Sequence, residues 1–182
     1  MFRPRFVVAA KASIAALLAA LATAGCDAPR PLATPLSGFS APFVFGRFQV
    51  PTDNPLTEEA VMLGRRLFYD PRLSANGAVS CSTCHVQRLA FTDGRPTSVG
   101  VSGKPLAFNS MSLANLMWGP QRFFWNGRAA TLEEQALIPL QHADEMAQDL
   151  GRLVADLAAD ASYREVFETA YGGISAEAIT RA

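Results

Sequence analysis

The stretch Cys81-Ser82-Thr83-Cys84-His85 decides how the rest of this 182-residue chain is interpreted. Its pattern, Cys-x-x-Cys-His, is the one to which haem is attached covalently. Two thiols three positions apart lie about one helical turn from each other, so both can form thioethers with the vinyl groups on one edge of a porphyrin. The adjoining imidazole then faces the iron as an axial ligand. We therefore expect one covalent haem c, attached through Cys81 and Cys84, with His85 bound to the iron.

Two other kinds of site also use paired cysteines. A thioredoxin-like redox pair lies in a fold where strands alternate with helices, and no such pattern flanks this stretch. Half of a zinc site needs a second Cys or His pair, but the remaining candidates are the isolated Cys26 and His142. Both alternatives are therefore weaker than haem attachment.

The N-terminus is typical of a secretory signal peptide. Residues 12–25 are apolar, end in small residues and are too short to span a bilayer. They are preceded by the basic residues Arg3, Arg5 and Lys11. We therefore expect residues 1–25 to act as an export signal.

The cleavage site of this signal has two interpretations. Ala22-Thr23-Ala24 fits the site of a soluble protein, whereas Ala24-Gly25-Cys26 resembles a lipoprotein box in which Thr23 replaces the usual Leu. A free thiol is a liability in an oxidising compartment, which favours a lipid-anchored Cys26. Such an anchor is the one membrane contact that we expect.

The composition indicates a neutral chain with room for one domain. Its 16 basic and 16 acidic residues cancel and form no basic run, so we expect no nucleic-acid partner. Removing 25 of the 182 residues leaves 157, enough for one hydrophobic core. Residues 26–55 contain six prolines and are expected to form an extended tether and lead-in. Four aromatic residues are expected to anchor part of it on the domain: Phe39, Phe43, Phe45 and Phe48.

Residues 56–182 are expected to form an all-α domain, because no alternating apolar run is long enough for a sheet. Thr57 is expected to cap a helix that runs to about Tyr69. Gly64 lies on the apolar face of this helix, where it would let another helix or the haem approach closely. The dipeptide Asp70-Pro71 then ends the helix.

The C-terminal third of the chain predicts more helices. Thr131 and Glu134 form a capping box at the start of one, which Pro139 is expected to stop. Two more are expected over residues 146–159 and 162–170, the second entered through Asp160 and ended by Gly172-Gly173. A short last helix capped by Ser175 is expected to bury little surface.

Several other stretches accompany the haem motif in a fixed order. They are Asp53-Asn54-Pro55, residues 63–70, Leu73-Ser74, Ala90-Phe91-Thr92-Asp93-Gly94, residues 109–115, Phe124-Trp125-Asn126-Gly127-Arg128, Leu132-Glu133-Glu134-Gln135, Pro139 and Glu145-Met146. In order and spacing they resemble the first haem domain of the di-haem cytochrome c peroxidase family, its MauG and MbnH-like branch included. The resemblance covers most of the chain after the signal.

The resemblance implies a cytochrome c-like fold and a bacterial enzyme of the periplasm or cell envelope. In the family, the first haem reacts with hydrogen peroxide, while a second haem in a following domain relays electrons from a small cytochrome or copper protein. A second haem and an interdomain calcium are expected only in a full-length member.

Three further site residues follow from the same resemblance. Glu145 and Gln135, ten positions apart as in the family, resemble the distal acid-base carboxylate and its amide neighbour. One carboxylate can take a proton from the near oxygen of peroxide and return one to the far oxygen. Trp125 resembles the tryptophan between the two haems, an electron conduit. The ordinary alternatives are a solvated Glu145, a plain helical Gln135 and a core Trp125.

Two substitutions depart from the family pattern. Val101 follows Gly100 where classical peroxidases place a removable His ligand, so we expect the first haem to be open on its distal side. His142, three residues before Glu145, is either an exposed histidine or reaches the pocket. Asn126 replaces the family aspartate and is expected to weaken a pairing with Arg128.

The third departure is the absence of a second Cys-x-x-Cys-His from the sequence. We expect a fragment truncated before its last helix is complete and before the second haem domain. Three functions stay open at this point: a peroxidase, a MauG or MbnH-like oxidase that modifies Trp or Tyr of a partner protein, and a single-haem electron carrier. The carrier would use Met111, Met117 or Met146 as the sixth iron ligand.

Overall fold

The computed structural model describes residues 36–37, 50–119 and 121–182, which all belong to one unit of the chain, Pro31–Ala182. The expected export signal and the four phenylalanines of the tether lie outside these residues. Residues 50–55, at the end of the tether, contain a turn and a bend and no helix. Within the described ranges, no helix is long and apolar enough to cross a membrane.

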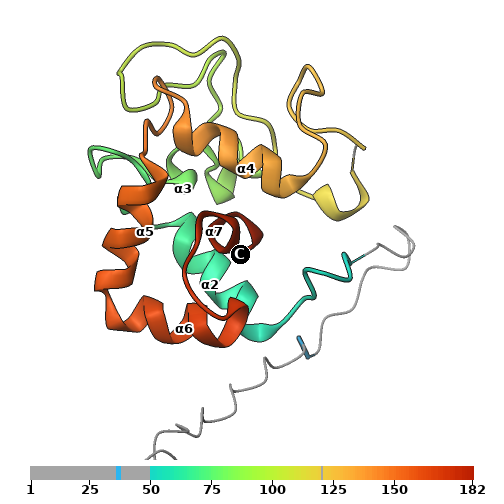
Figure 1. Cartoon of the computed structure of the whole chain (residues 1–182). Helices are drawn as coiled ribbons and strands as arrows, with labels where there is room; N and C mark the ends of the chain where they lie inside the picture. Colours follow the sequence, from blue (N-terminus) through green and yellow to red (C-terminus); the bar gives the residue numbers. More distant parts are fainter. Residues whose placement is uncertain (1–35, 38–49, 120) are drawn as a thin grey trace, which may run out of the picture. The chain divides into compact units, whose positions relative to one another are not determined.

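The described part of the chain is all-α, as predicted (Figure 1). Its α-helices are α2 (Glu58–Phe68), α3 (Cys81–Cys84), α4 (Leu132–Gln141), α5 (Leu150–Ala159), α6 (Ala161–Tyr171) and α7 (Ala176–Arg181). Three single-turn 3₁₀ segments are η2 (Pro71–Leu73), η3 (Gln87–Leu89) and η4 (Leu116–Trp118). Extended pairing in this part is limited to isolated bridges, Val86 with Thr92, Val99 with Pro105 and Phe123 with Ala129.

The core lies where α2, α5, α6 and α7 meet, and α4 packs on α7. Helices α2, α5 and α6 each bury two large side chains four residues apart, which places both on one helical face. These residues are Leu63, Leu67, Leu153, Leu157, Tyr163 and Phe167. Burial of each apolar side chain of this size contributes about 1.5–3 kcal/mol.

The helix caps predicted at Thr57, Asp160 and Ser175 are confirmed by their hydrogen bonds. The Thr57 hydroxyl accepts from the Ala60 N–H, the Asp160 carboxylate from Ser162 and the Ser175 hydroxyl from Ala178. At α4, the Thr131 hydroxyl accepts from Glu134 N–H, as predicted. The Glu134 carboxylate, however, accepts from the Ala130 N–H at 2.6 Å, so this capping box is shifted by one residue.

Two predicted helix boundaries are wrong. Pro139 lies inside α4, which continues to Gln141, so the proline does not stop the helix. The main-chain oxygens of Pro139 and Leu140 instead accept from Met146 and Gln148. The helix predicted to begin at residue 146 begins at Leu150, because Ala147 has a positive φ of 51°.

Gly64 is the point at which α7 approaches α2. A Cβ atom at position 64 would collide with the main-chain oxygen of Ala182. The close approach predicted for Gly64 is therefore confirmed, with α7 as the neighbour. Although α7 is short, it places Ala178 and Ile179 in the core, which is more burial than its length predicts.

A polar cluster ties η2 to α6 beneath this core. The fully buried Tyr163 donates its hydroxyl to Asp70 at 2.6 Å, and Arg72 forms an ion pair with the same carboxylate at 2.7 Å. Burial by itself would raise the pKa of Asp70, but the hydrogen bonds from Arg72 and Tyr163 outweigh it and lower this pKa. The Arg66 guanidinium also stacks 3.6 Å from the centre of the Tyr163 ring.

Candidate haem site

Helix α3 presents the two thiols of the Cys-x-x-Cys-His motif to one cavity. It is a single turn, in which the His85 N–H donates to the Cys81 oxygen at 2.9 Å. The Thr83 hydroxyl accepts from the Ser80 N–H at 3.0 Å and fixes the start of the turn. Cys81, Cys84 and His85 all line the cavity, as the motif predicts.

The imidazole of His85 is oriented by the turn that follows it. Its Nδ1 lies 2.8 Å from the main-chain oxygen of Phe91. The turn is closed by the bridge between Val86 and Thr92, and both Ala90 and Phe91 have positive φ. A hydrogen bond from Nδ1–H leaves Nε2 unprotonated, which is the form that binds a metal. Reasoning from the sequence missed this acceptor, because a main-chain oxygen leaves no side-chain signal.

The cavity is large and mostly apolar. Its volume is about 760 Å³, within the range of small-molecule and cofactor sites. Apolar side chains of several elements contribute to its lining, among them Leu67, Phe68, Val79, Leu113, Ile138 and Met146. Thiols and imidazole on one wall of an apolar cavity of this size are the donor set that a haem c requires, so the residues present fit this group.

Burial keeps both thiols protonated at neutral pH. It raises the pKa of Cys81 to about 11. Burial, with the nearby carboxylates of Asp93 and Glu145, also raises the pKa of Cys84. Cysteines of thioredoxin-like redox pairs instead have lowered pKa values, so these thiols lack the property on which that alternative depends.

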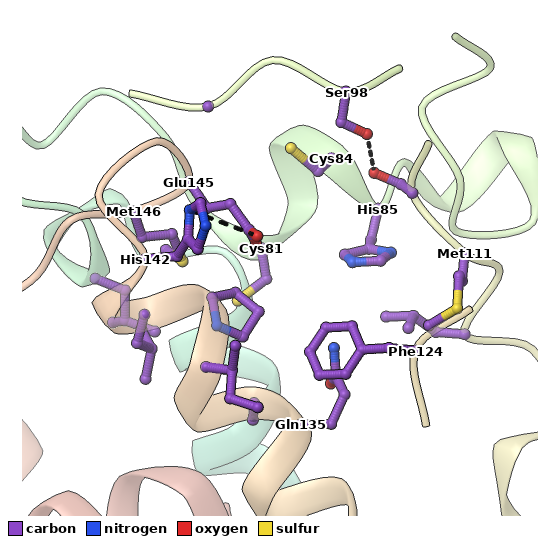
Figure 2. A pocket seen from close by; sticks show the side chains of 18 of the residues that line it. Cys81, Cys84, His85, Ser98, Met111, Phe124, Gln135, His142, Glu145 and Met146 are labelled. Atoms are coloured by element: carbon purple, nitrogen blue, oxygen red, sulfur yellow. Dashed lines mark hydrogen bonds and ion pairs between the residues drawn. The ribbon is translucent and has the colours of Figure 1, made fainter. Parts of the chain in front are cut away.

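Glu145 lies on the segment that follows α4 and lines the same cavity. Its side chain is 24% exposed, which excludes the fully solvated surface carboxylate considered from the sequence. His142 also lines the cavity, with its Nδ1 3.8 Å from the Glu145 Oε1 (Figure 2). His142 is thus both partly exposed and within reach of the pocket.

Gln135, half-buried on α4, lines the cavity as well. Figure 2 shows the Gln135 and Glu145 side chains apart from each other, with Glu145 beside His142. The structure therefore brings Gln135 and Glu145 to one cavity but to different parts of it. Phe124 has a positive φ of 65°, a conformation rare for a bulky residue, and points into the cavity.

Trp125 lies at the exposed rim of the cavity. It is 61% exposed, so it is not the core residue that its aromatic neighbours suggest. Its indole Nε1–H donates to the main-chain oxygen of Asn109 at 3.3 Å. Close by, the Asn126 Oδ1 accepts from the Arg128 Nη1 at 3.2 Å, so the two residues still pair, through a hydrogen bond from the guanidinium to an uncharged amide oxygen.

Residues 58–182 match the di-haem cytochrome c peroxidase family. The chain belongs to this family. MauG of Methylorubrum extorquens is 44% identical over 122 residues, which are 67% of this chain and 34% of MauG. Cytochrome c peroxidase Ccp of Escherichia coli is 38% identical over 135 residues, which are 73% of this chain and 29% of the relative. The chain thus spans about a third of the length of the curated relatives it matches.

A solved relative agrees with this assignment. The crystal structure of a MauG-like protein associated with microbial copper homeostasis has a TM-score of 0.72 and 40% sequence identity to this chain. The match covers 80% of this chain and 45% of that structure.

The residues considered as sixth ligand of the iron differ in whether they line the cavity. Val101 has no side-chain ligand atom and donates its N–H to the Glu145 oxygen at 2.8 Å. Met111 and Met146 line the cavity, and Met146 is buried in the core. Met117 is exposed and does not contribute to the lining.

Proposed function

We propose that this chain is the peroxide-reacting haem domain of an oxidoreductase of the cytochrome c peroxidase type. The observation that carries the proposal is that Cys81, Cys84, His85 and Glu145 line one cavity. A haem attachment site and a half-buried carboxylate within one apolar cavity are the two parts that peroxide chemistry needs.

The reaction that fits these residues is reduction of hydrogen peroxide to two water molecules. It consumes two electrons and two protons. A haem c held by Cys81 and Cys84 would supply the redox-active iron. The two protons must be delivered by one of the few polar side chains of the mostly apolar lining, or by water.

Glu145 is the residue that we propose for proton transfer. Its carboxylate can accept a proton from one peroxide oxygen and return it to the other, which makes that oxygen leave as water. Gln135 can donate from its amide nitrogen and accept at its carbonyl oxygen, and thereby orient peroxide or water. His142, next to Glu145, would connect this carboxylate with solvent because its side chain is 47% exposed.

Electrons would enter at the exposed rim of the cavity. Trp125 combines an exposed indole with a place in the cavity lining, which suits transfer from a second haem of a longer protein. We propose a small cytochrome or copper protein as the donor. A second haem and a calcium ion belong to this proposal only for a full-length protein.

A second candidate function is oxidation of Trp or Tyr side chains on a partner protein. Relatives named MauG and a MauG-like solved structure are 44% and 40% identical to the chain, and Val101 offers no ligand at the position of the removable histidine. Both functions share the same proton chemistry at Glu145. They differ in whether electrons come from a small donor protein or from the side chain that is modified.

We also propose that the protein works in the bacterial periplasm or at the cell envelope. The basic, apolar and small-residue order of residues 1–25 supports export. Cys26 at the end of this segment supports a lipid anchor. Attachment of haem to a Cys-x-x-Cys-His motif is consistent with such a location, because free thiols there would otherwise oxidise.

The proposal is tested by Glu145→Gln, which removes the acid-base group and keeps the size of the side chain. After rapid mixing with hydrogen peroxide, the change in the visible spectrum should be slower by roughly 100- to 10,000-fold. Gln135→Leu should slow it less. The matched control is Glu165→Gln on the exposed face of α6, which should react like wild type.

Two outcomes contradict the proposal. If Glu145→Gln reacts as fast as wild type, Glu145 does not transfer protons. If the ferric protein shows a Met-iron absorption band and does not react with peroxide, the chain is an electron carrier. Oxidation of a reduced small cytochrome by peroxide, compared with peroxide-driven modification of a partner protein, distinguishes the two enzymatic functions.

A further inference from the structure

The main chain at Glu145 is in direct contact with the loop that contains Gly100. The Val101 N–H donates to the Glu145 oxygen at 2.8 Å. A Cβ atom at position 100 would lie 2.6 Å from the Glu145 Cα and closer still to the Asp144 oxygen. Real Cβ atoms essentially never approach main-chain atoms so closely, so any side chain at position 100 would push the two segments apart.

Space, and not backbone conformation, is what requires glycine here. Gly100 is not among the glycines with positive φ, so an alanine could adopt its backbone angles. Gly103, three residues later, shows the opposite case: its φ is 71°, but a Cβ there would meet no atom within 4 Å. Replacement of Gly100 therefore acts through its contact with Asp144 and Glu145.

The Gly100 loop is held from its other side. Ser98 is 2% exposed, and its hydroxyl lies 2.6 Å from that of Ser110 (Figure 2). The Ser98 main chain also bonds to Phe108 and Leu106, at 3.1 and 2.8 Å. These bonds hold the loop in place independently of Glu145. The loop can therefore fix the position of the segment that contains Glu145.

The Glu145 segment, by contrast, has little regular structure of its own. It lies between the end of α4 at Gln141 and the start of α5 at Leu150. The N–H groups of Glu145 and Ala147 both donate to the His142 oxygen at 3.0 Å, in a turn that needs the positive φ of Ala147. The following residues Met146 and Gln148 are bonded to α4, and the Gly100 loop is the contact that packs directly behind the main chain of Glu145 itself.

We propose that Gly100 is a positioning residue for Glu145: the absence of a side chain lets the loop dock on the Glu145 main chain and holds the carboxylate in the cavity. This inference rests on the proposed proton transfer by Glu145. A displacement of about 1 Å can reduce the rate of a positioned catalytic group by on the order of 100-fold. Gly100→Ala should therefore slow the reaction with peroxide while leaving haem attachment intact.

The test is a double-mutant cycle of wild type, Gly100→Ala, Glu145→Gln and the double variant. We expect Gly100→Ala to slow the reaction with hydrogen peroxide by on the order of 100-fold in the wild-type background. In the Glu145→Gln background it should have no further effect. Gly151→Ala, on the exposed side of α5, is the matched glycine control and should change neither background.

A readout that does not depend on activity is hydrogen-deuterium exchange of the peptide that contains Val101. Its amide is protected by the bond to Glu145 and should exchange faster in Gly100→Ala, but not in Gly151→Ala. Equal slowing of the reaction by Gly100→Ala in both backgrounds, or no slowing, overturns the positioning role. Unchanged exchange at Val101 also overturns it.

The two proposals fail in different ways. If Glu145→Gln alone reacts like wild type, the proton-transfer role fails, while the exchange measurement still tests the contact at Gly100. If Gly100→Ala does not fold, Ser98→Ala replaces it, because it removes only the hydroxyl bonded to Ser110. Ser98→Ala should slow the reaction with peroxide less than is expected for Gly100→Ala. This slowing should occur in the wild-type background and not in the Glu145→Gln background. Slowing in the Glu145→Gln background contradicts the inference.

Discussion

The Nδ1 atom of His85 lies 2.8 Å from the main-chain oxygen of Phe91, six residues further along the chain. This contact fixes the orientation of the ring, because the turn between the two residues is closed by its own main-chain bonds. The Nε2 atom is thereby left as the free ligand.

Our first prediction concerns covalent attachment. Exported together with a haem-attachment system, the wild-type chain should carry one haem c that survives denaturing electrophoresis and stains for peroxidase activity in the gel. Cys81→Ala or Cys84→Ala should reduce this stain strongly, because each removes one thioether. Ser82→Ala, within the same helical turn, is the control that should stain like wild type. An unstained band from exported wild type would contradict the assignment of the motif.

The second prediction concerns the sixth coordination position. Val101 has no ligand atom and its N–H is bonded to Glu145, so ferric iron should be five-coordinate or water-bound. Cyanide should therefore bind without prior reduction, and electron paramagnetic resonance should show high-spin iron. A purely low-spin signal would mean that a protein side chain occupies this position. His142→Ala, followed by Met111→Leu, would then identify the ligand.

The third prediction concerns stability in acid. Arg72 and Tyr163 lower the pKa of Asp70 despite its burial, so the Asp70 carboxylate stabilises the fold above the pKa of an unfolded aspartate, about 3.9. This stabilisation is lost as the pH falls through the lower pKa of the folded state. Asp70→Asn should cost about 1.5–3 kcal/mol of unfolding free energy at pH 7, from hydrogen bonds to charged groups. The difference from wild type should shrink at pH 3.

Urea unfolding at both pH values measures this effect. Asp156→Asn is the control, because Asp156 is exposed and pairs with Arg152 on the surface of α5 at 3.5 Å. Its loss should cost less than about 0.5 kcal/mol at either pH. If Asp70→Asn lowers the unfolding free energy equally at pH 7 and pH 3, the charge of the Asp70 carboxylate does not contribute to stability, and the prediction is wrong.

Local chemistry made most of the helices predictable from the sequence. Each of three helices begins at a residue whose side chain accepts a hydrogen bond from a main-chain N–H group: Thr57, Asp160 and Ser175. At the other end of α6, Gly172 ends the helix in the left-handed conformation. The close approach at Gly64 could also be predicted from the sequence, because a glycine on the apolar face of a helix leaves room for a neighbouring segment.

What failed depends on contacts between distant segments. The helix predicted from residue 146 gives way to a turn, because the N–H groups of Met146 and Gln148 bond back to α4. Trp125 was ambiguous for the same reason: only the fold decides whether an aromatic residue faces the core or the rim. Gly100 carried no signal at all, since its role lies in a contact with a segment 45 positions away.

Part of the cavity wall comes from α7, which is synthesised after the haem-attachment motif. Ile179 lines the same cavity as Cys81, yet it lies 98 positions later in the chain. As a chain emerges from its N-terminus, the two thiols and the imidazole are available long before that wall exists. The cavity is thus enclosed on this side only once α7 has been synthesised and has packed in place.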